Sequence, residues 1–155
     1  QPVEEEAPAE EYLPGTRENL DVNICPYIEQ NPDTKFVVFF PPYSILFWND
    51  VVVGNHLEAT LAQYRYLAER LNAYDNVEVY FFPDREDIIL DLNNYADYSH
   101  YHPRYNRFMA ECFADGSTGL VAKEGSKKGK TIDEYLSHMK TIVQNYDFEE
   151  LLSGE

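Results

Sequence analysis

Two short segments are rich in β-branched and aromatic residues, whereas elsewhere the apolar residues mostly recur every three or four positions. Residues 36–40 (FVVFF) form a run that is apolar throughout, and residues 77–82 (VEVYFF) form a second run of similar character. Strands of this composition are typical of parallel sheets that helices cover on both faces. Pro41 and Pro42 cannot donate hydrogen bonds to a ladder, so the first strand is expected to end there. Both segments are therefore predicted to be strands of one buried sheet.

Helical periodicity occupies most of the remaining sequence. The apolar pattern predicts helices over residues 16–31, 55–71, 85–90, 103–113 and 131–146. Pro26 lies inside the first of these and predicts a kink or a restart of the helix. Asn55 and Glu58 have the spacing of a capping pair at the start of the second helix. Thr131 and Glu134 have the spacing of a capping box at the start of the last helix.

Other segments carry weaker signals. Residues 45–54 (ILFWNDVVVG) are expected to form a loop with a short helical turn, and Gly119–Ala122 is a weak third strand. Residues 1–15 are acidic and rich in proline and alanine, a composition that cannot bury enough surface to offset the entropy of ordering. They are predicted to be a linker or a disordered segment. The folded domain is predicted to span residues 16–152.

The alternation of helices and strands predicts an α/β fold built in layers. Two convincing strands are few, because sheets in globular domains usually have about five or six. The sheet is therefore expected to be incomplete. Either the domain is abbreviated, or polypeptide outside these residues completes the sheet.

The net charge of the chain bears on which classes of partner it can bind. It carries 28 acidic and 12 basic residues, a formal net charge of -16, which argues against nucleic acid and disfavours an anionic membrane surface. The sequence contains no run of about 18 apolar residues that would predict a membrane span. Cys25 and Cys112 lie far apart without metal-ligand spacing, so buried thiols are expected, and a disulfide between them is left open.

The strongest candidate for chemistry is Asp97-Tyr98-Ser99-His100, in a segment (residues 93–106, NNYADYSHYHPRYN) that follows the second predicted strand. In open parallel sheets, the loops beyond the carboxyl ends of the strands form the binding site. A carboxylate three residues before a histidine on such a turn can accept a hydrogen bond from Nδ1–H. That bond fixes the tautomer and leaves Nε2 free as a general base. The spacing alone is common by chance, and an unrelated loop Asp and His is the alternative interpretation.

The segment DLNNYADYSHYHPRYNRFMAE (residues 91–111) resembles the last conserved block of the SGNH, or GDSL-type, hydrolases. The resemblance extends over roughly residues 17–114 and implies a three-layer, flavodoxin-like parallel sheet flanked by helices. It also implies that Asp97 is the triad acid and His100 the general base of a serine esterase or acyl hydrolase. The family's G-D-S nucleophile block is not in this sequence, nor are its Gly and Asn oxyanion blocks. The chain therefore resembles the carboxyl-terminal portion of such an enzyme and is expected to be inactive alone. An ester or acetylated glycan substrate, and an extracellular or cell-envelope location, are implied by the family alone.

Several further residues are candidates for the same site. Ser44 ends the first strand region and is the alternative nucleophile. Tyr43, Trp48 and Tyr101 are candidates to line a substrate groove, with core or rim positions as the alternative. Asn106 could hydrogen-bond the D-x-x-H loop.

No cofactor or metal is predicted. His100, His102 and His138 do not have the spacing of a familiar metal site together with a carboxylate.

Two other hypotheses remain beside the hydrolase. The chain could be a non-catalytic binding or interaction module on the same scaffold, because the nucleophile is missing and the surface is acidic and aromatic. Alternatively, the missing strands could come from an amino-terminal segment or another chain, which would make the protein part of an obligate complex.

Overall fold

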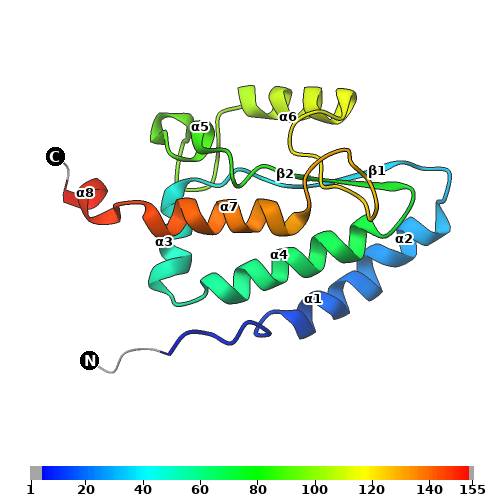
Figure 1. Ribbon diagram of the computed structural model, residues 1–155, viewed down its shortest axis with the longest axis horizontal. Coiled ribbons are helices and arrows are strands. Elements are labelled where there is room, and N and C mark those ends of the chain that lie inside the picture. The colour runs from blue at the N-terminus through cyan, green and yellow to red at the C-terminus, as the bar shows by residue number, and fades with distance from the viewer. Residues whose placement is uncertain (1–4, 154–155) are drawn as a thin grey trace.

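A computed structural model describes residues 5–153, with side chains through residue 151. The elements follow one another along the chain as α1 (Leu13–Asn19), η1 (Leu20–Ile24), α2 (Cys25–Gln30), β1 (Phe36–Phe40), α3 (Ile45–Val53), α4 (Leu57–Asn72), β2 (Val77–Phe81), α5 (Glu86–Ile89), η2 (Leu92–Asn94), α6 (Arg104–Asp115), α7 (Ile132–Asn145) and α8 (Phe148–Ser153). The protein is a mixed helix and strand structure with a small parallel sheet flanked by helices (Figure 1).

The sheet consists of β1 and β2, which run parallel with Phe36 opposite Val77 and Phe40 opposite Phe81. The predicted third strand is reduced to isolated bridges, an antiparallel one between Leu120 and Tyr80 and a parallel one between Val121 and Lys130. Gly119 accepts a hydrogen bond from the amide of Phe81 at 2.8 Å on the edge of β2 away from β1. Gly119 has a φ of +85°, and a Cβ there would lie 2.8 Å from the ring of Phe82. That conformation interrupts regular strand geometry, which explains the missing third strand.

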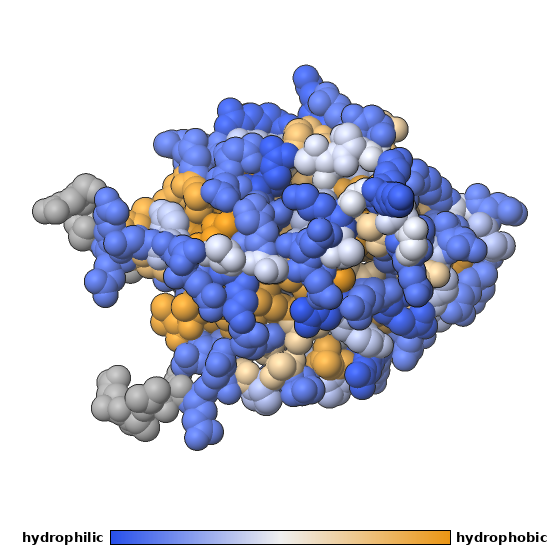
Figure 2. Space-filling view, viewed as in Figure 1, coloured by the Kyte–Doolittle hydropathy of each residue, from blue (hydrophilic) through white to orange (hydrophobic). Residues whose placement is uncertain are grey.

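Helices cover both faces of the sheet. α4 and α7 lie on one face and α6 on the other (Figure 1). The larger core packs the first face, where the buried strand residues are Phe40, Val77, Val79 and Phe81. A smaller core lies beneath α6 and contains Tyr80, Phe82, Met109, Cys112 and Leu120. The face seen in Figure 2 is mostly hydrophilic, in keeping with the net charge of -16.

Residues 45–54 differ from the prediction of a loop, because Ile45–Val53 is the regular helix α3. Ser44 is its N-cap, and its Oγ lies 3.4 Å from the amide of Phe47. The helix carries few polar residues, so its sequence shows no alternation between a polar and an apolar face. Because of that composition, the helical periodicity cannot be recognised from the sequence.

The first predicted helix is divided into three parts. α1 and α2 are joined by the π-helical turn η1, and Pro26 falls in the first turn of α2. A proline is tolerated there because the first amides of a helix have no intrahelical acceptor. The predicted restart at Pro26 is therefore confirmed.

The two capping predictions have different outcomes. The box of Thr131 and Glu134 is confirmed, with the Thr131 amide donating to Glu134 Oε2 at 2.7 Å. The prediction that Asn55 and Glu58 form a capping pair is wrong. α4 starts one residue later, with His56 at its N-cap position and no side-chain cap.

Part of the predicted linker is ordered. Residues 13–15 belong to α1, and the amide of Ala7 donates to Asn55 O at 2.8 Å. Tyr12 stacks on His56, and its hydroxyl lies 2.9 Å from the ring Nδ1. These contacts hold the segment against the α3–α4 connection, although most of its residues are exposed. Residues 1–4 of the predicted linker lie outside the described residues.

Cys25 and Cys112 are both buried and both free. Cys25 belongs to the large core and Cys112 to the small core on the opposite face. The expectation of buried thiols is therefore confirmed, and the two do not form a disulfide.

His138 on α7 joins that helix to the segment after β2. Its Nδ1 lies 3.0 Å from the buried carboxylate of Asp84, and its Nε2 lies 3.1 Å from Glu86. Hydrogen bonds to Asp84 and Glu86 raise the pKa of His138 above its ordinary value. Both nitrogens carry a proton only in the imidazolium, which is the form that satisfies both carboxylates.

This arrangement predicts a pH dependence of stability. Because the pKa is raised on folding, the contribution of His138 is fully present below its unfolded pKa of about 6.5 and is lost as the pH rises through the folded value. The difference in unfolding free energy between the wild type and His138→Gln should therefore be largest in mild acid and shrink in mild alkali. Urea unfolding across that range measures it. Glu86→Gln, which keeps the Asp84 contact, should lose only part of the dependence; a difference that does not vary with pH would contradict the assignment.

Candidate active site

The segment between η2 and α6 forms a tight loop at the carboxyl-terminal end of the sheet. Tyr95 and Tyr101 form an antiparallel bridge at its base, and the amide of Ala96 donates to His100 O at 2.8 Å. Asp97 Oδ1 accepts from the amides of Ser99 at 2.9 Å and His100 at 2.8 Å. Asp97 thus closes the turn with one carboxylate oxygen, as aspartate commonly does in loops.

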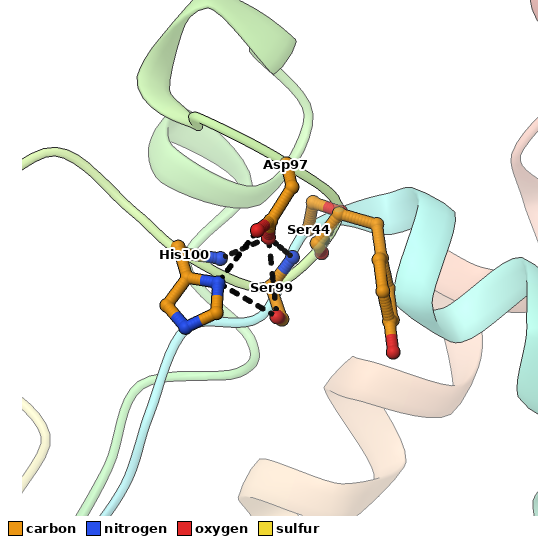
Figure 3. A network of polar contacts seen from close by, with 5 residues as sticks. Ser44, Asp97, Ser99 and His100 are labelled. Atoms are coloured by element: carbon orange, nitrogen blue, oxygen red, sulfur yellow. Dashed lines mark hydrogen bonds and ion pairs between the residues drawn. The ribbon is translucent and has the colours of Figure 1, made fainter.

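The second carboxylate oxygen of Asp97 holds the ring of His100. Nδ1 of His100 lies 2.7 Å from Oδ2, and Figure 3 shows the other ring nitrogen pointing away from Asp97. The predicted Asp–His hydrogen bond is therefore confirmed. With Nδ1 donating, Nε2 is the free basic nitrogen. The His100 side chain is 80% exposed, and no hydrogen bond to Nε2 is present among residues 5–153.

The environment of Asp97 stabilises its charged form. Hydrogen bonds from the amides of Ser99 and His100 are the main cause, and the His100 ring adds to them; together they hold the pKa of the Asp97 carboxyl well below its usual range. Asp97 therefore stays ionised when a neighbouring imidazole is protonated.

A carboxyl titration followed by carbon-13 NMR checks this environment. We expect the pKa of Asp97 to lie below that of ordinary aspartates. In His100→Ala the pKa should rise but remain depressed, because the backbone amides of residues 99 and 100 persist. An ordinary pKa for Asp97 in the wild type would show that the carboxylate does not hold the turn.

Four contacts that the sequence did not reveal fix the loop to the fold. Asn94 is 1% exposed and donates from Nδ2 to Ile88 O at 3.0 Å, while its Oδ1 accepts from Arg104. The amide of His102 donates to the backbone oxygen of Asn94 at 2.7 Å. The hydroxyl of Tyr95 donates to Pro42 O at 2.6 Å. The D-x-x-H loop is therefore positioned by η2, by α6 and by the segment after β1.

Ser44 also positions this loop and is not the nucleophile predicted as an alternative. It is 0% exposed, and its hydroxyl donates to the backbone oxygen of Tyr98, besides capping α3. A hydroxyl that is buried and donates its proton to a carbonyl cannot donate it to His100 at the same time. Figure 3 shows Ser44 on the side of the loop away from the His100 ring.

The prediction that Trp48 lines a substrate groove is likewise wrong. It is 0% exposed and packs edge-on against Tyr64 in the large core. Sequence reasoning could not separate the two roles because aromatic residues are common in both settings.

A depression of about 570 Å³ opens beside His100. Besides His100, it is lined by Phe39, Pro41, Tyr43, Ser99, Tyr101 and Asn106. Tyr43 and Tyr101, which are predicted to line a groove, are both among these lining residues. Burial, with a contribution from Tyr43, raises the pKa of Tyr101, so its phenol remains a hydrogen-bond donor near neutrality. Asn106 lines the depression rather than bonding the loop.

A second depression, of about 540 Å³, lies near the start of β2. Asn72 and Lys123 are among its lining residues. The Lys123 ammonium donates to the backbone oxygens of Asn72 at 3.0 Å and Tyr74 at 2.7 Å, which gives it a structural role. The chemistry therefore concentrates at His100.

The histidines do not assemble a metal centre. Within the described part of the chain, no group of three or more His, Cys, Asp or Glu side chains could hold an ion. His102 accepts at Nδ1 from the amide of Arg104 at 3.1 Å, and His138 binds Asp84 and Glu86.

Comparison with protein-family models, with curated proteins and with solved structures gave no match. Within residues 5–153, no helix has the length and apolar character needed to cross a membrane.

Proposed function

We propose that this chain is the carboxyl-terminal part of an SGNH-type serine esterase or acyl hydrolase, with its parallel sheet an incomplete flavodoxin-like sheet. Asp97 is the triad acid and His100 the general base. The observation that carries the proposal is the 2.7 Å hydrogen bond from His100 Nδ1 to an Asp97 carboxylate that two backbone amides also hold.

The proposed mechanism follows from this geometry. His100 Nε2 takes the proton of a serine hydroxyl as the hydroxyl oxygen attacks the ester carbonyl, and it later returns a proton to the leaving alcohol. Asp97 stays ionised and stabilises the imidazolium, as its depressed pKa favours. The aromatic wall formed by Tyr43 and Tyr101 suits an acyl group or a sugar ring.

The nucleophile comes from polypeptide other than residues 5–153. Ser99 is the nearest serine in sequence, but its Oγ lies 3.4 Å from Nδ1, on the same side of the ring as Asp97. Ser44 is buried and engaged. Neither can deliver a proton to Nε2.

The chain by itself should therefore not turn over an ester. Hydrolysis of p-nitrophenyl acetate by the wild type should exceed that by His100→Ala by no more than the slow, non-saturable reaction of an exposed imidazole. Saturable turnover that depends on His100 would contradict the assignment of the nucleophile to other polypeptide.

Whether His100 Nε2 is unprotonated and reactive can be tested without the nucleophile. Diethyl pyrocarbonate acylates unprotonated imidazole nitrogens, and mass spectrometry after proteolysis reports each histidine. We expect His100 to react faster than His102, an exposed neighbour without a carboxylate partner. Asp97→Asn should slow the reaction of His100 because an amide NH₂ facing Nδ1 favours the Nε2–H tautomer. Equal reaction rates of His100 in the wild type and in Asp97→Asn would show that Asp97 does not set the protonation of the His100 ring.

A further inference from the structure

One edge of β1 has no backbone partner in the described part of the chain. Phe36 donates to Asn76 O at 2.8 Å and Phe40 O accepts from Phe82 at 3.1 Å, so the even-numbered residues turn their backbone groups toward β2. By the alternation of a strand, Val37 and Phe39 turn theirs to the opposite side. No backbone hydrogen bond to these groups is present among residues 5–153.

The exposed side chains of this edge are apolar and lie beside the ion pair of Lys35 with Glu78, the residue opposite Val37. Val37 is 38% exposed and Phe39 is 41% exposed, and the ring of Phe39 lies 5.4 Å from that of Phe113 on α6. Asn106 and Ala110 share a helical face with Phe113 because they lie seven and three residues before it. An acidic chain thus leaves an apolar surface beside an open strand edge.

Soluble proteins usually protect such an edge with lysine, proline, a bulge or a covering segment. β1 itself (FVVFF) contains no lysine or proline and pairs with β2 in regular register. Lys35 directly before it and Pro41 directly after it limit the open edge to residues 36–40. An unprotected edge of this kind fits the addition of another strand.

This apolar edge leads directly into the depression beside His100. Phe39 belongs to both, and Pro41 and Tyr43 continue from the end of β1 into the wall of the site. A strand laid parallel to β1 would therefore end next to Nε2 of His100, a nitrogen that neither Ser44 nor Ser99 reaches. An antiparallel strand would begin there instead.

We propose that the free edge of β1 binds an extended polypeptide strand in parallel orientation, with apolar side chains at alternate positions and neutral or basic flanks. The parallel direction rests on the proposed function, because it places the turn after that strand, and the hydroxyl it carries, at His100. Neutral or basic flanks follow from the net charge of -16. The same charge disfavours a second copy of this chain as the occupant.

The test uses a synthetic strand peptide, acetyl-Lys-Val-Thr-Val-Thr-Val-Lys-amide, and the nitrogen-15-labelled chain. On addition of the peptide, amide hydrogen exchange at Val37 and Phe39 should slow by about tenfold or more. A nitroxide on the peptide's carboxyl end should broaden the signals of His100 and Tyr101, and one on its amino end should broaden those near Lys35. No slowing at Val37 and Phe39 up to millimolar peptide, or the opposite pattern of broadening, would overturn the proposal.

Two controls isolate the backbone pairing. Val37→Pro removes an outward N–H without removing a β1–β2 hydrogen bond and should abolish the protection of Phe39, whereas Val37→Thr should keep it. If Val37→Pro lowers stability, the wild type with a peptide N-methylated at alternate residues gives the same expected loss. Protection of Val37 and Phe39 without peptide, together with a dimer mass by light scattering, would identify a second copy as the occupant and overturn the proposal.

The outcomes also separate this inference from the hydrolase. His100→Ala should bind the peptide as the wild type does. If the peptide binds but the His100 ring is not hydrogen-bonded to Asp97, the proposed function is wrong and the docking edge stands. If the ring is hydrogen-bonded to Asp97 but no peptide binds, only the docking edge is wrong.

Discussion

Replacing Trp48 by alanine is expected to lower the free energy of unfolding by about 3–5 kcal/mol, the range for truncating a buried aromatic side chain. Trp48 is 0% exposed and is packed between Phe47 and Tyr64. A residue that only lined a substrate groove would cost far less, because surface substitutions usually change stability by less than about 0.5 kcal/mol. Chemical denaturation of the two proteins measures the difference.

Trp48→Phe is the matched control. It keeps most of the apolar volume and removes an indole N–H that is buried without a partner among the described residues. We expect the loss in Trp48→Phe to be much smaller than in Trp48→Ala. A change of less than about 1 kcal/mol in Trp48→Ala would place Trp48 at the surface and contradict the core packing.

Replacing Asn94 by leucine is expected to cost about 1–3 kcal/mol and to disturb the Asp97–His100 pair. The amide of Asn94 is buried, donates to Ile88 O at 3.0 Å and accepts from Arg104. A leucine of similar size would leave the Ile88 carbonyl unpaired and the guanidinium of Arg104 without this acceptor. Because the loop starts at Asn94, the cost should appear in two readouts, the urea midpoint and the NMR signal of the proton between Asp97 and His100.

Asn93→Leu is the neighbouring control. Asn93 is exposed, and among residues 5–153 its side chain bonds only Asp91, with its Nδ2 at 2.9 Å from Oδ1. That variant should leave the Asp97–His100 proton signal unchanged. Equal behaviour of the two variants would show that Asn94 does not anchor the loop.

Local signals predicted most of the fold. Residues 36–40 and 77–82 were recognised as strands because their composition suits a surface buried on both sides, and β1 and β2 occupy almost the same positions. The capping box at Thr131 combined a local signal with a clear apolar face and was also correct. By contrast, the sequence did not predict helix α3, because its residues do not divide into a polar and an apolar face. Its packing against α4 and α7 depends on long-range contacts that the local pattern does not contain.

The candidate site shows the same division between local and long-range information. The bond between Asp97 and His100 joins residues three apart, so the sequence could predict it. The roles of Ser44 and Asn94 depend on Tyr98 and on Ile88 with Arg104, contacts that exist only once the loop is folded. Serine and asparagine occur equally in sites and in turns, and residue type alone does not distinguish the two.

The proposed function depends most on which nitrogen of His100 carries the proton. Long-range proton–nitrogen NMR of the neutral ring reports this directly, with Asp97→Asn as the comparison. We expect the wild type to carry the proton on Nδ1, facing the carboxylate, and the variant to carry it on Nε2. A wild-type ring protonated on Nε2 would leave no base for a hydroxyl and would contradict the proposed hydrolase.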